Sequence, residues 1–426
     1  MKKFANPTKE VVVEIQKRQA LDYSELLPKV QNVFKAVQEE GDTAILRFTE
    51  QFDKVKLQKS GVDSDELEGD NLSSELKNAI DVAYDNIYAF HLAQDKKETL
   101  VETTEGVKCW RENRAIEKVG FYIPGGSAPL FSTVLMLGIP AKIAKCDEIV
   151  LCTPPNKEGQ IHPSILYAAK KCGIKSIYKI GGIQAIAAMT LGTESVSKVF
   201  KIFGPGNAFV TAAKQYAQSL GVSIDMPAGP SEVLVIADAN ANPSYVAADL
   251  LSQAEHGPDS QVILLSDSQK AIDNALLELE SQLAALPRKD IATKALQNSS
   301  AVLLTDLEAC LDFSNEYAPE HLILALDDSE RFLPNIKNAG SVFIGEYSCE
   351  SLGDYASGTN HTLPTNGFAR SYSGVSLDSF IKKITFQSVS KKGILNIGPA
   401  VEIMAEAEGL FAHKNAVSVR LKNIEA

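Results

Sequence analysis

Three stretches of the chain share one pattern: KVGFYIPGGSAP (118–129), SIYKIGGIQAIAAM (176–189) and KVFKIFGPGNAFVTAAK (198–214). Each begins with a short apolar run, enters a turn that contains glycine, and continues with residues at helical spacing. Repeated strand–turn–helix units imply a parallel sheet with helices on its faces. The sequence therefore predicts an α/β fold for this part of the chain.

A second series of apolar runs lies between residues 231 and 345. The runs are SEVLVIAD (231–238), QVILLS (261–266), SAVLLT (300–305), LILAL (322–326) and SVFIG (341–345). They alternate with helical patterns such as PSYVAADLLSQAEHG, so we expect a second α/β lobe. After about Ser373 the pattern becomes helical and ends in a charged amphipathic tail. Because such a tail has little core of its own, we expect it to pack on something else, such as another subunit.

At roughly 150 residues per domain, a length of 426 residues suggests two or three domains. The patterns above predict two α/β domains with a helical extension at each end. We predict an N-terminal helical segment (1–22), a first α/β domain (23–119 plus 232–372), a second α/β domain (120–231) and a helical tail (373–426).

The composition limits the class of partner. A formal charge of −12 argues against a nucleic acid or an acidic membrane, which reward clustered Lys and Arg. The start, MKKFANPTKE, lacks an apolar h-region, and no later run approaches ~18 apolar residues, so we expect a cytoplasmic protein with a small-molecule substrate. The six cysteines form no CxxC pair and are expected to be reduced thiols. Cys152, in EIVLCTPP, is predicted to be a buried strand residue rather than a nucleophile.

The glycine loops favour a nucleotide crevice by their number, although none of them is a true GxGxxG. In the loop that starts at Gly204, Phe209 stands where the third glycine belongs, which makes Asp225 a weak candidate for a ribose-binding carboxylate. Tyr122 could stack on a ring, and Gln184 and Asn207 could hydrogen-bond the ribose or the nicotinamide amide. The alternative is that Gln184 and Asn207 only cap their helices.

Candidate metal ligands are scattered along the chain. Gln253 and His256 are three residues apart near a helix end and so share one face, but QxxH alone also fits a plain helix-end pair. Asp354 lies on a glycine-flanked loop, and Glu408 and His413 lie in the tail around Gly409. Two further histidines, His91 and His162, have no partner at metal spacing and are expected to have ordinary structural roles.

Glu320 and His321, in EYAPEHLIL, form a possible acid–base pair before an apolar strand. A histidine can exchange protons near neutral pH, and a neighbouring glutamate can deprotonate water. Within a strand the two side chains would point to opposite faces, so they can serve one site only if the turn after Pro319 breaks the alternation. The alternative is a salt bridge at the rim of the fold.

Seven stretches together resemble the zinc-dependent histidinol dehydrogenases. They are VGFYIPGGSAPLFSTVLMLGIPA (119–141), KIFGPGNAFVTAAK (201–214), DMPAGPSEVLVIAD (225–238), DLLSQAEHG (249–257), NEYAPEHL (315–322), GDYASGTNHTLPT (353–365) and AEGLFAHKNAV (407–417). Several are long and idiosyncratic, whereas the part before residue 100 is only loosely similar. The resemblance implies two Rossmann-like parallel-sheet lobes with helical N-terminal and C-terminal extensions.

The resemblance also implies roles for individual residues. Those matching the family's zinc ligands are Gln253, His256, Asp354 and His413, and those matching its acid–base pair are Glu320 and His321. The positions that contact NAD are Tyr122, Gln184 and Asn207. The positions that contact the substrate are Ser231, Gln253, His256, His321, Asp354, Glu408 and His413, and His361 approaches it.

The implied activity is the oxidation of L-histidinol to L-histidine, with two hydride transfers to two NAD through a bound L-histidinaldehyde, as the last step of histidine biosynthesis. One Zn²⁺ per subunit would position the substrate, His321 would act as the base and Glu320 would activate water. The resemblance implies a homodimer in which the C-terminal segment completes the site of the other subunit.

Two other classes of function fit parts of the pattern. A zinc hydrolase would also use such ligands and a glutamate base, although it has no use for a nucleotide crevice. A metabolite-binding protein without activity could share the fold.

Overall fold

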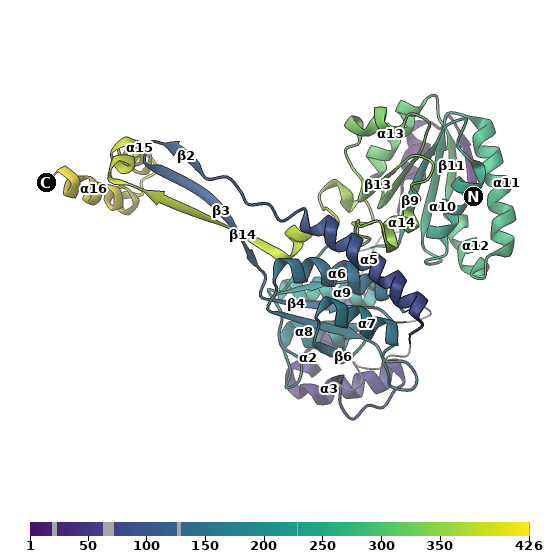
Figure 1. Ribbon diagram of the computed structural model, residues 1–426, viewed down its shortest axis with the longest axis horizontal. Helices are drawn as coiled ribbons and strands as arrows, with labels where there is room; N and C mark the ends of the chain where they lie inside the picture. The colour runs from purple at the N-terminus through teal and green to yellow at the C-terminus, as the bar shows by residue number, and fades with distance from the viewer. Residues whose placement is uncertain (19–23, 63–71, 126–128, 228, 426) are drawn as a thin grey trace.

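The computed structural model describes residues 1–18, 24–62, 72–125, 129–227 and 229–425. Figure 1 shows two α/β lobes and a long arm that projects away from them. The first lobe is built on a six-stranded sheet of order β1-β11-β10-β9-β12-β13, and the second on a five-stranded sheet of order β6-β5-β4-β7-β8. All neighbouring strands in both sheets are parallel. The predicted pair of parallel-sheet lobes is confirmed.

The first lobe has a six-stranded sheet covered on both faces. Its strands are β1 (Lys2–Ala5), β9 (Glu232–Ala237), β10 (Gln261–Ser266), β11 (Ser300–Leu303), β12 (His321–Ala325) and β13 (Ser341–Ile344). Its helices are α1 (Lys9–Ile15), α10 (Pro243–Ala254), α11 (Gln269–Ala285), α12 (Lys289–Gln297), α13 (Leu307–Tyr317), η2 (Ser329–Asn335) and α14 (Glu350–Tyr355). Apolar side chains of β9 and β10 are buried in clusters on both faces, as the unbroken apolar runs predict.

The second lobe has the same architecture on a smaller sheet. Its strands are β4 (Lys118–Tyr122), β5 (Glu148–Thr153), β6 (Ser176–Lys179), β7 (Lys201–Phe203) and β8 (Ser223–Ile224). Its helices are α2 (Leu27–Glu40), α3 (Asp42–Phe48), η1 (Thr49–Asp53), α5 (Ser74–Leu92), α6 (Phe131–Ala144), α7 (Pro163–Cys172), α8 (Gly182–Leu191) and α9 (Ala208–Ser219).

Two features of the N-terminal part depart from the predicted domain boundaries. Residues 1–22 were expected to be helical, but the described part begins with β1, which pairs with β11 at the edge of the first sheet. Residues 23–119 were expected in the first lobe, yet α2 and α3 pack on α8 and α5 packs on α6. The apolar face of α2, which includes Val33 and Phe34, is buried in the core of the second lobe. Helical spacing predicts which face of a helix is buried, but not which lobe buries it.

The arm contains a three-stranded antiparallel ribbon and two helices. Its elements are β2 (Val101–Thr104), β3 (Val107–Ala115), β14 (Ile381–Val389), α15 (Lys391–Ala407) and α16 (Phe411–Glu425). The expectation of a helical pattern from about Ser373 is therefore wrong for β14, which pairs with β3 from Ile381↔Ala115 to Val389↔Val107. IKKITFQSV has no strict alternation of buried and exposed positions, and its partner strand lies more than 260 residues earlier in the chain. Two short 3-10 helices, η3 (Phe368–Arg370) and η4 (Leu377–Phe380), precede the ribbon.

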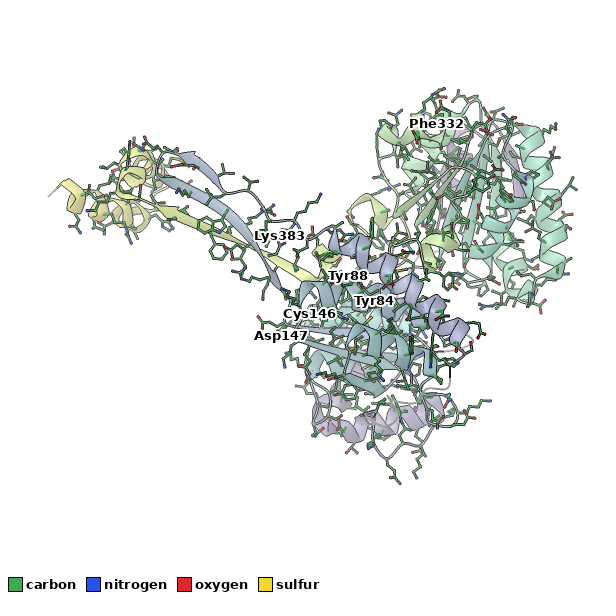
Figure 2. All side chains as sticks on the ribbon, viewed as in Figure 1. Tyr84, Tyr88, Cys146, Asp147, Phe332 and Lys383 are labelled. Carbon is green, nitrogen blue, oxygen red and sulfur yellow. The ribbon has the colours of Figure 1, made fainter. Side chains whose placement is uncertain are left out.

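The base of the arm contacts the second lobe, and its tip projects away from both lobes. In Figure 2, Lys383 marks β14, and Cys146 marks the nearby end of α6. The Cys146 Sγ lies 4.0 Å from the carbonyl oxygen of Phe380, just before β14. At the tip, α15 and α16 pack on each other and leave large apolar side chains exposed, among them Ile403, Met404 and Phe411. Within the described residues, no helix combines the length and apolar character needed to span a membrane.

Candidate active site

The predicted acid–base pair lies at the amino ends of the central strands of the first lobe. Glu232 begins β9 and His321 begins the neighbouring strand β12. Helix α10 starts with the Asn242 side chain capping the Ser244 N–H and runs back along the sheet, so its last turn reaches the same edge. This brings Gln253 next to His321, although they are far apart in the sequence.

Glu320 and His321 face one site because the strand starts only at His321. Ala318 has a left-handed backbone with φ of 55°, and the turn sets Glu320 outside the strand alternation. The His321 Nδ1 and the Glu320 carboxylate are 3.6 Å apart, and both side chains are buried. The Glu320 carboxylate also accepts a hydrogen bond of 2.9 Å from the backbone N–H of Glu232. The geometric condition that the sequence imposed on this pair is met.

Gln253 is fully buried, and its side-chain nitrogen faces two oxygen acceptors and the His321 ring. The amide nitrogen lies 3.2 Å from the Glu232 carbonyl oxygen, 3.4 Å from the Glu320 carboxylate and 2.9 Å from the Nδ1 of His321. The amide oxygen is left buried without a hydrogen-bond partner. Buried polar atoms are nearly always paired, so an unpaired carbonyl oxygen here indicates a position for a ligand.

Three further polar groups gather on the other side of His321. The His321 Nε2 lies 3.5 Å from the Asp354 carboxylate. Ligand atoms of His256, Glu350 and Asp354 all lie within 4.8 Å of one another. One oxygen each of Glu350 and Asp354 is buried without a partner, as is the His321 Nε2. Imidazole and carboxylate groups at this spacing can hold a divalent metal ion such as zinc.

Burial and mutual charge shift the acid–base properties of this cluster strongly. Burial raises the pKa of Glu320 to about 8, and burial raises the pKa of Glu350 above its ordinary value. Burial alone would lower the pKa of His321. The carboxylates of Glu350, Glu320 and Asp354 outweigh that effect together and raise the pKa of His321 to about 10. Without a cation these shifts favour the protonated forms of Glu320, Glu350 and His321, and a bound cation would stabilise the ionised carboxylates.

Glu350 was missed by the sequence reasoning. It lies one helical turn before Asp354 on α14, so the two carboxylates share a face. The spacing E-x-x-x-D in CESLGDYASG was the available signal. It is weak because acidic residues four apart are common on exposed helices, and only the packing of α14 against α10 buries this pair.

The glycine loops line two adjoining cavities. The larger has a volume of about 1050 Å³ and is lined by Tyr122, Gln184 and Asn207, the three residues expected near NAD. The smaller, of about 420 Å³, is lined by Ser231, His256, Glu320 and His361 as well as by Asn207. Asn207 thus stands at the junction of the two cavities. Its side chain also caps α9 by accepting from the N–H groups of Phe209 and Val210, so the capping role is real.

The Asp225 carboxylate makes its hydrogen bonds within its own loop and to Lys214. Its carboxylate accepts from the Lys214 ammonium at 2.5 Å, from the Gly204 N–H at 2.8 Å and from the Met226 N–H at 2.7 Å. These bonds hold the loop that follows β7. Both carboxylate oxygens have partners, so the position does not offer a free acceptor for a ribose hydroxyl.

The remaining histidines and Cys152 have identifiable surroundings. His361 bridges the lobes, with Nδ1 2.8 Å from the Asp354 carbonyl oxygen and Nε2 3.1 Å from Thr133 on α6. His91 is buried against the carbonyl oxygen of Ile87, and His162 caps α7. Cys152 is fully buried in β5, where burial raises the pKa of its thiol.

Glu408 and His413 are not at this site within a single chain. Glu408 directly follows α15 and His413 lies in α16, and both side chains are exposed. The two helices form the tip of the arm (Figure 1). The structure therefore brings together Gln253, His256 and Asp354 with the Glu320–His321 pair, and it holds the two tail residues apart from them.

A histidinol dehydrogenase family model matches residues 16–421 of the chain. The chain belongs to the histidinol dehydrogenase family. It is 56% identical to a histidinol dehydrogenase from Bacteroides thetaiotaomicron over 427 residues, which cover 100% of both proteins. It is also 56% identical to a chloroplastic histidinol dehydrogenase from Arabidopsis thaliana over 97% of this chain and 90% of the relative.

A solved structure supports the same assignment. The crystal structure of histidinol dehydrogenase from Elizabethkingia anophelis superimposes with a TM-score of 0.98 at 59% sequence identity, covering 100% of this chain and 99% of that one. Family membership implies an oxidoreductase of histidine biosynthesis that acts on a CH–OH group and uses NAD.

Proposed function

We propose that this chain oxidises L-histidinol to L-histidine with NAD, through a bound L-histidinaldehyde. The observation that carries the proposal is the cluster of Gln253, Glu320, His321 and Asp354. One oxygen each of Gln253 and Asp354 and the His321 Nε2 have no hydrogen-bond partner, and Glu320 lines the smaller cavity next to the glycine loops. A general base, a cation-binding set and a dinucleotide-sized cavity are the parts that an alcohol oxidation by hydride transfer requires.

The residues present fit a zinc ion. The unpaired oxygens of Gln253 and Asp354 and the imidazole of His256 are suitable donors, and His413 of another subunit would complete the set of ligands. Zinc, when bound, supplies a positive charge that fixes the substrate's position and offsets the carboxylates around His321. Glu350, on the same face of α14 as Asp354, would contribute negative charge beside this set.

The chain's own groups then move the protons. His321 accepts the hydroxyl proton of the alcohol as the C–H bond of the same carbon breaks, which leaves the aldehyde. Glu320 deprotonates a water molecule as its oxygen adds to the aldehyde carbonyl, and His321 returns its proton to the carbonyl oxygen to give the diol. His321 then accepts a proton from one diol hydroxyl as the remaining C–H bond breaks, which leaves the carboxylic acid. NAD, when bound, supplies the hydride acceptor, and two equivalents are needed because the alcohol loses four electrons on the way to the carboxylate. The smaller cavity would hold the reactive aldehyde between the two steps.

We further propose that the active form is a homodimer in which the arm reaches the partner's site. The exposed apolar side chains of α15 and α16 need a covering surface, and Glu408 and His413 lie among them. A second copy would bury these helices and bring His413 to the cluster in the first lobe. The cytoplasmic location expected from the sequence belongs to this proposal as well.

Incubation with histidinol and NAD tests the proposed activity. We expect about two NADH per histidinol consumed, with histidine as the product. A zinc hydrolase or an inactive binding protein would form no NADH, and that result would reject the proposal. The metal requirement is tested separately by dialysis against a chelator and measurement of bound zinc, where Gln253→Leu should retain less zinc than the wild type.

A further inference from the structure

Asp53 is a half-buried carboxylate in the larger cavity that no role above explains. It is the last residue of η1 and lines the cavity together with Tyr122 and Gln184. Its carboxylate accepts a hydrogen bond of 3.3 Å from the Gln184 side-chain nitrogen. The amide oxygen of the same Gln184 is fully buried and has no hydrogen-bond partner. Two acceptor groups, one of them unpaired, therefore stand side by side at the cavity.

The glycines after β6 make this arrangement possible. A Cβ at Gly181 would lie 2.9 Å from one oxygen of Asp53 and 2.8 Å from Pro154. A Cβ at Gly182, whose φ is +58°, would lie 3.1 Å from the Gln184 amide oxygen. The backbone therefore leaves room for both acceptors at the start of α8. Holding a carboxylate here has a cost, because burial raises the pKa of Asp53 to about 6.

We propose that Asp53, positioned by Gln184, accepts a hydrogen bond from the 2′-hydroxyl of the adenosine ribose and selects NAD against NADP; this rests on the proposed use of NAD. The Gln184 amide oxygen would accept from the adjacent 3′-hydroxyl. A vicinal diol offers two donors to two acceptors, and a carboxylate is the acceptor commonly used for this diol in dinucleotide sites.

The position in the cavity identifies which ribose is bound. The nicotinamide must reach His321, and the smaller cavity on that side is lined by Glu320 and His256. Asn207 lines both cavities, so a dinucleotide extending past it places its other half in the larger cavity. Asp53 lines only the larger cavity, and it therefore meets the adenosine half.

Charge explains the selection. A 2′-phosphate would place negative charge against the Asp53 carboxylate and would lack the donor that the diol provides. Lys29 also lines this cavity, with its ammonium 5.7 Å from the centre of the Phe209 ring. The ratio of the dissociation constants for NAD and NADP therefore reports the combined effect of the Asp53 carboxylate and the Lys29 ammonium.

The test compares Asp53→Asn with Glu50→Gln, which removes an exposed negative charge from the same π-helical turn. Dissociation constants for NAD, 2′-deoxy-NAD and NADP are measured by calorimetry on the zinc-loaded protein. We expect Asp53→Asn to weaken NAD binding about ten- to a hundredfold, and to narrow the gap between NAD and NADP by a similar factor. Glu50→Gln should leave all three constants within about twofold of the wild type.

The 2′-deoxy analogue keeps the inference testable even if the variant folds poorly. The wild type should bind 2′-deoxy-NAD about tenfold or more weakly than NAD, and Asp53→Asn should lose most of this difference. Equal binding of NAD and 2′-deoxy-NAD by the wild type, or equal effects of the two substitutions, would overturn the role of Asp53. Failure of the wild type to bind NAD or to form NADH from histidinol would instead reject the proposed function.

Discussion

The chain contains two Glu–His sets in opposite environments. Glu320 and His321 are buried at the amino ends of β9 and β12, 3.6 Å apart, among acceptors and carboxylates from α10 and α14. Glu408 and His413 are exposed on the arm, on two helices that pack mainly on each other. The first Glu–His set is therefore surrounded by the polar groups that a site needs, and the second set has no such groups around it among the described residues of one chain. The difference shows that the surroundings of a side chain, and not its residue type alone, decide whether it forms part of a site.

Removing residues 390–426 should have the largest effect on turnover, because it deletes both helices of the arm together with Glu408 and His413. We expect turnover to fall by at least about 10⁴-fold while the lobes stay folded, since their cores contain few arm residues. Circular dichroism and light scattering would show a folded monomer. A truncated chain with normal turnover would mean that the first lobe needs nothing from the arm.

His321→Asn tests the buried Glu320–His321 set. We expect kcat to fall about 10²–10⁴-fold because the proposed base is lost, with bound zinc nearly unchanged. His162→Asn alters a histidine that caps α7 and lines the larger cavity; it is the control, and it should change kcat little when NAD is saturating. If the zinc content falls in parallel with kcat in His321→Asn, the residue would be holding the metal site rather than moving protons.

Mixing two inactive variants tests whether the two sets meet across subunits. His413→Ala and His321→Asn should together recover about a quarter of the wild-type activity after subunit exchange, since half of the dimers carry one intact site. Each variant alone, treated in the same way, is the control. Heterodimers verified by mass spectrometry that remain inactive would show that each site is built from one chain.

The smallest expected effect is a change in the free energy of unfolding that comes from a buried acidic side chain in the first lobe. Burial raises the pKa of Asp249, one turn before Gln253, to about 7. The folded chain thus holds a proton that the unfolded chain releases near the ordinary value of 3.8, so stability is lost as pH rises between these values. Asp249→Asn should be more stable than the wild type by about 1 kcal/mol at pH 8, and by less at pH 5.

Urea unfolding of the metal-free protein at both values of pH measures this difference. Glu280→Gln, an exposed position on α11, should show no comparable dependence on pH. A stability difference for Asp249→Asn that is constant between pH 5 and 8 would contradict the assignment.

Much of the fold could be predicted because its signals are local. The apolar runs and glycine turns around Gly181 and Gly204 predict strands and helices from neighbouring residues alone, and the structure has them. Gln253 and His256 could be paired from their helical spacing. By contrast, β14 was missed because its partner β3 lies far away in the sequence. Helix α2 was assigned to the wrong lobe because an apolar helix face does not indicate which surface it packs against.

The sequence by itself determined the two parallel-sheet lobes, the glycine loops and, apart from Glu350, the candidate residues for holding a metal ion or moving a proton. Only the tertiary structure decided that Glu350 joins Asp354, that Asp53 meets Gln184, and that His413 is held away on an arm. The physical reason is that periodicity and turn chemistry act over a few residues. Burial, charge and the meeting of distant elements depend on how all the surfaces pack at once.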